Sequence, residues 1–144
     1  LSVPTDLIGV VAMRAAFLLD RLAALGEPID RAGTGKLVEV YPAPALGTWG
    51  INAVGYKSSA GAARLPELLA EVERRLGRLD LDARQRALAE SDHNSFDALV
   101  CSLVARSSAL GLTAGPPAEL ANRAVREGWI HIPTNPLSDL MNGG

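Results

Sequence analysis

Cysteine, lysine and histidine are scarce in this 144-residue sequence, and each shortage narrows the range of possible functions. Its single cysteine, Cys101, excludes an internal disulfide and is typical of a reducing compartment. Because Cys101 ends the apolar run 98–101, we expect a buried, inert thiol rather than a nucleophile. One cysteine with two histidines forms no zinc-binding pattern, so we expect His93 and His131 to be surface or hydrogen-bonded core residues.

The sequence also has no long apolar run and no excess of positive charge. Its longest apolar stretch, residues 7–19, contains Arg14 and is too short to span a bilayer, and no signal peptide is visible. The formal net charge of −2 differs from the basic balance of a strong non-specific nucleic-acid binder. With 48% hydrophobic and 21% charged residues, the chain is expected to form one soluble, cytoplasmic domain over residues 1–144.

Periodic apolar positions predict a helix-rich fold. We expect long helices over residues 5–25, 62–76, 95–110 and 117–128, with shorter ones over 43–49 and 84–90. The first helix should have one buried face, formed by Leu7, Val10, Val11, Ala15, Leu18, Leu19 and Leu22. Only Ser102 is polar between positions 98 and 105, so the third long helix should be nearly surrounded by protein. Trp49 and Trp129 are expected to anchor the core.

Two short strands are predicted, over residues 37–41 and 129–132. The first is apolar on both faces except for Glu39, which is typical of a central parallel strand covered by helices on both sides. The glycine-rich turn 33–35 precedes Lys36, but a strand follows instead of a helix, so a phosphate-binding P-loop is excluded. Because two strands alone do not form a stable sheet, we expect further strands from an upstream segment, or a second copy of the chain at the open edge.

Two carboxylates stand out from this pattern. A charge in an apolar strand costs free energy unless it is paired, bound to metal or at the strand end, so Glu39 is either a functional carboxylate or a structural one. Asp97 falls in the first turn of the helix predicted over 95–110. It either belongs to a capping box begun by Asn94 or, if Asp92 is the cap, is free for another role.

A buried strand and a buried helix would bring Glu39 and Asp97 together at one end of a sheet. Carboxylates within roughly 8 Å of each other can share Mg²⁺ or Mn²⁺, ions that prefer oxygen ligands and that activate water for phosphodiester cleavage. A two-metal centre needs more than two acids, and Asp92 is the nearby candidate for a third metal ligand.

Several short motifs follow one another in a particular order along the chain. They are Val38-Glu39-Val40-Tyr41-Pro42, Gly55-Tyr56-Lys57, Arg64, Asp97-Ala98-Leu99 and Glu127-Gly128-Trp129-Ile130-His131-Ile132-Pro133. Together they resemble a family of predicted RNase H-like nucleases, domain of unknown function 429, over nearly the whole chain. The resemblance implies an α/β, helix-rich RNase H-like fold with Glu39 and Asp97 as catalytic, metal-binding carboxylates. It also implies that Tyr56, Lys57 and Arg64 lie near the site and bind substrate, with Lys57 meeting a phosphate or a carboxylate.

The resemblance has one departure, because the family's first acid lies on an N-terminal strand that this chain does not contain. We therefore expect the C-terminal portion of a nuclease domain, dependent on Mg²⁺ or Mn²⁺ and inactive on nucleic acid by itself. A second hypothesis is a non-catalytic interaction or oligomerisation module that forms a homodimer through an exposed sheet edge. A third is a small-molecule-binding α/β domain, which would need a closed pocket beside the turn at residues 33–35.

Overall fold

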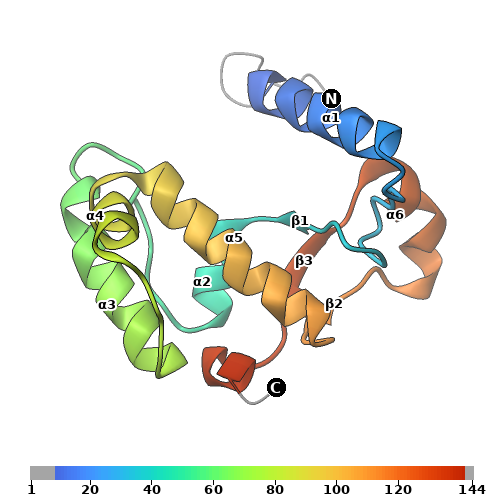
Figure 1. The fold of residues 1–144 in the computed structure, drawn as a ribbon. Coiled ribbons are helices and arrows are strands. Elements are labelled where there is room, and N and C mark those ends of the chain that lie inside the picture. Colours follow the sequence, from blue (N-terminus) through green and yellow to red (C-terminus); the bar gives the residue numbers. More distant parts are fainter. Residues whose placement is uncertain (1–8, 142–144) are drawn as a thin grey trace.

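The structure is a computed structural model, and it describes residues 9–141 as a mixed α/β arrangement rich in helix (Figure 1). The elements in chain order are α1 (Val10–Ala24), β1 (Glu39–Val40), α2 (Pro42–Thr48), η2 (Ala62–Arg64), α3 (Leu65–Leu76), α4 (Ala83–Ser91), α5 (His93–Ala109), β2 (Thr113–Ala114), η3 (Ala118–Leu120), α6 (Ala121–Glu127), β3 (Ile130–Pro133) and η4 (Leu137–Met141). The predicted α/β class and the predominance of helix are confirmed.

The sheet has three short strands in the order β1-β3-β2. β1 runs parallel to β3 with Glu39 opposite Ile130, and β2, which the sequence did not predict, runs antiparallel to β3. The parallel direction of the first strand is confirmed, but its central position is wrong for the described residues, where β1 is an edge strand. Residues 37–41 are half-buried or exposed rather than buried on both faces. Apolar composition alone does not reveal which neighbour covers a strand.

The hydrophobic core lies between α2, α3, α5 and η4. The core face of α3 follows helical spacing and consists of Leu65, Leu68, Leu69, Val72 and Leu76. α5 crosses the sheet and contacts β1, β3, α2 and α4, so it joins the helical half to the strands (Figure 1). Trp49 is buried in this core as predicted, whereas Trp129 is half-buried and donates its indole N–H to the Ala114 carbonyl at 2.9 Å.

Helix α5 begins at His93 because Asp92 caps it. The Asp92 carboxylate accepts hydrogen bonds from the backbone amides of Asn94 and Ser95. This start lies before the predicted one, so Asp97 is in the second turn and the capping box begun by Asn94 is wrong. α5 is also less enclosed than predicted, since its Ser102 face is exposed. Burial raises the pKa of the half-buried Cys101 thiol, as does the nearby Asp97 charge, which agrees with an inert cysteine.

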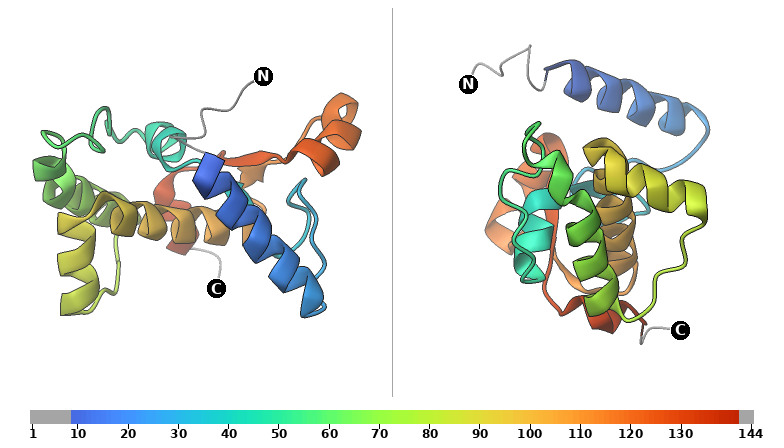
Figure 2. Two further views of the ribbon diagram at one scale, coloured as in Figure 1. Left: turned by 90° about the horizontal axis from the view of Figure 1, so that it is seen from above. Right: turned by 90° about the vertical axis from the view of Figure 1, so that its left-hand side faces the viewer.

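Helix α1 lies away from the rest of the molecule (Figure 2). Its predicted start at Thr5 and the position of Leu7 lie outside the described residues, and its end at Ala24 agrees with the sequence. The predicted buried face is wrong, because no residue of α1 is buried and Val11 and Leu18 are 64% and 61% exposed. Periodicity identifies an apolar face without identifying what covers it. None of the helices formed by residues 9–141 is long and apolar enough to cross a membrane.

Because α3 is buried and α1 is exposed, replacing a leucine by alanine should lower the free energy of unfolding much more in α3 than in α1. Leu69→Ala empties a fully buried site in α3 and should lower the free energy of unfolding by about 2–5 kcal/mol. The matched change Leu18→Ala, on the exposed face of α1, should alter it by less than about 0.5 kcal/mol. Urea denaturation of the two variants measures both values, and equal losses would show that α1 is packed in solution.

Candidate functional site

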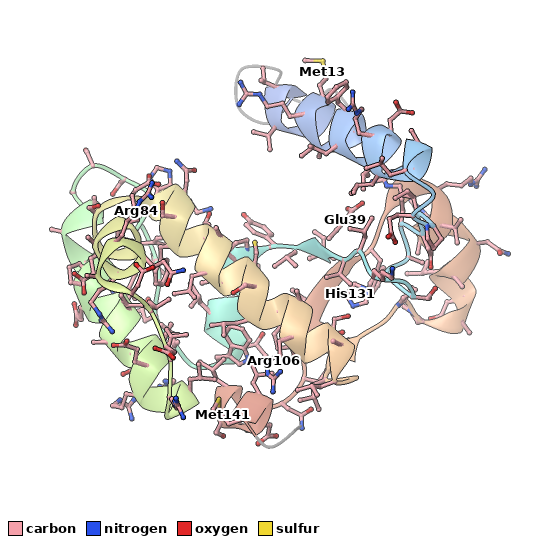
Figure 3. The ribbon with its side chains drawn as sticks, viewed as in Figure 1. Met13, Glu39, Arg84, Arg106, His131 and Met141 are labelled. Carbon is pink, nitrogen blue, oxygen red and sulfur yellow. The ribbon has the colours of Figure 1, made fainter. Side chains whose placement is uncertain are left out.

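Glu39 forms an ion pair with Arg31 at the beginning of β1. The Arg31 guanidinium donates to Oε1 of Glu39 from Nη2 at 2.7 Å and from Nε at 3.1 Å. Both hydrogen bonds use the same oxygen, and no described residue donates to Oε2, which leaves that oxygen available to a ligand. The Glu39 side chain is 39% exposed and lies on the side of β1 that faces α1 (Figure 3). Of the alternatives for Glu39, the structure shows the ion-paired one.

Arg31 also binds the C-terminal end of α6. It donates from Nη1 to the Arg126 carbonyl and from Nη2 to the Glu127 carbonyl, each at 3.0 Å, and its own carbonyl accepts from the Trp129 amide. A cation at this position is favoured by the partial negative charge of a helix C-terminus. Arg31 thus holds the start of β1 against the segment that leads into β3, and we call these contacts the Arg31 junction.

Gly128 completes the Arg31 junction because a side chain does not fit there. Its backbone angles, φ 92° and ψ 161°, lie in a region that essentially only glycine adopts. A Cβ atom at this position would lie 2.5 Å from both carboxylate oxygens of Glu39 and 2.7 Å from Nη2 of Arg31. The ion pair therefore depends on a residue without a side chain at the end of α6.

Asp97 is held by two adjacent residues from a different part of the chain. The Tyr56 hydroxyl donates to Oδ1, and Nζ of Lys57 donates to Oδ2 at 2.5 Å. Burial, and then the hydrogen bond and charge of Asp97, raise the pKa of Tyr56 far above its ordinary value, so this hydroxyl stays protonated and donates. The Asp97 side chain is only 19% exposed. Because Asp92 caps α5, these contacts of Asp97 serve no capping purpose.

The loop that carries Tyr56 and Lys57 is fixed by Arg64 and by the core. The Arg64 guanidinium donates to the carbonyls of Val54 and Asn52 at 2.9 and 2.8 Å. The Tyr56 ring packs edge-on against Phe96, with ring centroids 5.7 Å apart. Arg64 therefore positions this loop, and its predicted contact with substrate stays a prediction.

A groove of about 560 Å³ lies beside this loop. In sequence, its lining residues run from Tyr41, directly after β1, to Tyr56 and Lys57, which bind Asp97. Its lining residues are Tyr41, Ala43, Gly47, Gly50, Ile51, Asn52, Ala53, Val54, Gly55, Tyr56 and Lys57. This groove was not predicted from the sequence. Its walls come from the residue after β1, from α2 and from the following loop, and only the tertiary structure brings these segments together.

The predicted metal ligands lie in separate contact networks. Glu39 and Asp97 belong to elements that pack together, β1 and α5, but no described residue bonds to both of them. The Asp92 carboxylate is occupied as a helix cap and also accepts from Ser95 Oγ at 2.8 Å; these hydrogen bonds lower its pKa. No three His, Cys, Asp or Glu residues between positions 9 and 141 are grouped so that they could hold a metal ion. Of the three predicted metal ligands, Glu39 and Asp97 are thus each paired with a cation, and Asp92 is a helix cap.

His131 is a hydrogen-bonded core residue, as one of its two predicted alternatives stated. Nδ1 lies 2.9 Å from the Thr113 hydroxyl, and Nε2 lies 3.1 Å from the Ala32 carbonyl.

The sequence did not predict the role of Arg31. Its position eight residues before Glu39, across a glycine-rich turn, was the available signal for the ion pair.

The fold and its contacts define a helix-rich α/β domain in which the partly buried Glu39 and Asp97 are each paired with a cation. The chain belongs to the family described as protein of unknown function (DUF429), which matches residues 1–121. The match covers β1, the loop with Tyr56 and Lys57, and the whole of α5, and it ends within α6. No curated protein and no solved structure matches the chain.

The Arg31 junction predicts that alanine is tolerated much less at position 128 than at another left-handed glycine. Gly77, at the end of α3, has φ 87° and nothing within 4 Å of an added Cβ. Gly77→Ala should cost about 1–2 kcal/mol of stability for its backbone conformation alone. Gly128→Ala should cost about 3 kcal/mol or more, because it also displaces the ion pair. Urea denaturation compares the two, and equal costs would contradict the junction.

Proposed function

We propose that this chain forms part of a metal-dependent phosphodiesterase of RNase H-like type. In this proposal Glu39 and Asp97 are two of the metal-binding carboxylates, Lys57 and Tyr56 orient Asp97 and the substrate, and nucleic acid is the substrate. A further acid would come from a strand that pairs with the open edge of β1. The observation that carries the proposal is Asp97, a largely buried acid that caps no helix and yet is held by two side chains.

The state of both carboxylates supports this role. Each is partly buried and each is neutralised by a basic side chain, Arg31 in one case and Lys57 in the other. A cation at such a position compensates charge in the absence of metal, and it can turn to a substrate phosphate when a metal ion takes its place. The unpaired Oε2 of Glu39 is suited to a first contact with such an ion.

The open edge of the sheet supports the RNase H-like assignment. β1 pairs with β3 on one side, and no described strand pairs with its other side. An edge strand of this kind presents backbone groups that a further strand can pair with. The exposed apolar face of α1 lies above the same region and would be covered by a larger sheet (Figure 2). A strand at this edge is where the proposal requires the additional acid.

The carboxylates of the described residues suit Mg²⁺ or Mn²⁺ in kind, because both ions prefer hard oxygen ligands. They do not suit it in grouping, since no three possible ligands among residues 9–141 gather as such a centre needs. When bound, the ion would activate water and stabilise the leaving oxygen. We therefore expect weak ion binding by this chain and no catalysis without the additional acid.

The alternative function is a non-catalytic interaction module. The open edge of β1 and the exposed Phe17 and Leu18 of α1 favour it, because both features are typical of surfaces that pair with another chain. This alternative requires no metal, so metal binding and self-association separate the two hypotheses.

Millimolar Mn²⁺ should bind weakly between Glu39 and Asp97. Because the ion is paramagnetic, the backbone amide signals of Val40 and Ala98 should broaden together in an NMR titration. The melting temperature should rise by about 3–5 °C at a tenfold excess of Mn²⁺ over its dissociation constant. Glu39→Gln and Asp97→Asn should each abolish the broadening at both positions.

The matched control for this titration is Glu90→Gln. Glu90 is also a partly buried acid paired with an arginine, Arg86, but it lies on α4 away from β1. This variant should bind Mn²⁺ as the unchanged chain does. Broadening at only one of the two positions, or broadening that survives Glu39→Gln, would show that the acids do not share an ion.

Cleavage and self-association of the chain should be measured side by side. The chain should not cleave single-stranded or double-stranded nucleic acid in Mg²⁺ or Mn²⁺, since residues 9–141 place no further acid beside Glu39 and Asp97. In sedimentation experiments it should dimerise through the open edge of β1, because that edge and the face of α1 are uncovered. A stable monomer that cleaves nucleic acid would overturn the account of an incomplete site.

A further inference from the structure

The groove beside α2 connects the strand of one candidate carboxylate to the holders of the other. Its lining includes Tyr41, two residues after Glu39, and also Tyr56 and Lys57, which bind Asp97. Its volume of about 560 Å³ is within the range of about 300–1,000 Å³ that small-ligand sites occupy. A ligand in this groove would therefore lie next to the proposed site of cleavage.

Tyr41 offers an exposed aromatic surface in the lining of the groove. The residue is 51% exposed, and its hydroxyl forms no hydrogen bond with the described part of the chain. Its backbone is fixed, because its carbonyl accepts the Ala45 amide at the start of α2. A rigidly anchored, exposed tyrosine next to an apolar groove is suited to stacking against a planar ring.

Two groups along the groove provide hydrogen-bond donors. Oδ1 of Asn52 accepts the Val54 amide at 3.3 Å, which fixes the carboxamide and leaves its NH₂ group without a partner among the described residues. Lys57 also lines the groove; its Nζ gives one hydrogen bond to Asp97, and its side chain is partly exposed. An ammonium has three donors, so Lys57 has capacity for a phosphate oxygen as well.

We propose that this groove binds one unstacked nucleotide of a single strand. The base stacks on Tyr41, the Asn52 amino group donates to an acceptor on the base edge, and the phosphate lies at Lys57. The apolar wall formed by Ile51 and Val54 suits the sugar and base better than it suits a free anion. This inference rests on the proposed function, because it names the substrate class of the same site.

The charge of the groove predicts how the binding of a nucleotide depends on salt. Lys57 is the one basic residue among its lining residues, and the whole chain carries a net charge of −2. Binding should therefore come mainly from stacking and should depend weakly on salt. With one phosphate contact, the logarithm of the affinity should fall with the logarithm of salt concentration with a slope of about −0.7.

The test is fluorescence anisotropy with a fluorescein-labelled hexamer of thymidylate in EDTA, so that no metal contributes. Tyr41→Ala should weaken binding by about 5- to 150-fold, the effect of losing one base–aromatic stack. Tyr41→Phe keeps the ring and should bind within about twofold of the unchanged chain. The control Phe17→Ala removes an equally exposed aromatic residue from α1 and should have no effect. Amide signals of residues 52–57 should shift on binding.

Three results would overturn the inference. They are an abasic hexamer that binds as tightly as thymidylate, unchanged binding by Tyr41→Ala, and an equal loss in Phe17→Ala. The outcome is separate from the metal titration of the proposed function. Stacking on Tyr41 in EDTA together with no shared Mn²⁺ site would leave a nucleotide-binding protein without the nuclease. Mn²⁺ shared by Glu39 and Asp97 without nucleotide in the groove would reject this inference alone.

Discussion

The Arg31 guanidinium joins segments that are far apart in the sequence, and the sheet depends on it. Nε and Nη2 neutralise Glu39 at the start of β1, while Nη1 and Nη2 bind the last carbonyls of α6. A partly buried carboxylate needs such a partner, and the end of a helix needs donors for its carbonyls. One side chain meets both needs, and in doing so it holds β1 beside the segment that becomes β3. The same crowding requires glycine at position 128.

A second polar network is built around Asp97 on α5, and no described residue bonds to both networks. Asp92 caps α5, and this frees Asp97 to receive Tyr56 and Lys57. Arg64 holds the loop of these two residues by its carbonyls, so the position of Asp97's partners is determined by rigid elements. The groove follows from this arrangement, because the loop that reaches Asp97 also forms its wall. A carboxylate and a ligand-sized groove thereby become neighbours.

Two surfaces of the described residues are left uncovered, the outer edge of β1 and the apolar face of α1. Among residues 9–141, β1 has one open edge and α1 has no buried residue. A hydrogen-bonding edge calls for a strand, and an apolar helix face calls for apolar surface. Both proposals of function are consistent with this geometry, and they differ in whether the covering strand also carries an acid.

The sequence by itself determined the elements whose signal is local. The apolar face of α3, the end of α1 at a glycine, the parallel strand that Pro42 terminates and the role of Asp92 as one possible cap can all be read from spacing and residue type. Only the tertiary structure decided that α1 is exposed, that β1 is an edge strand and that Arg31 pairs with Glu39. The reason is physical: periodicity records which face of an element is apolar, whereas covering that face or neutralising a charge depends on partners distant in the chain.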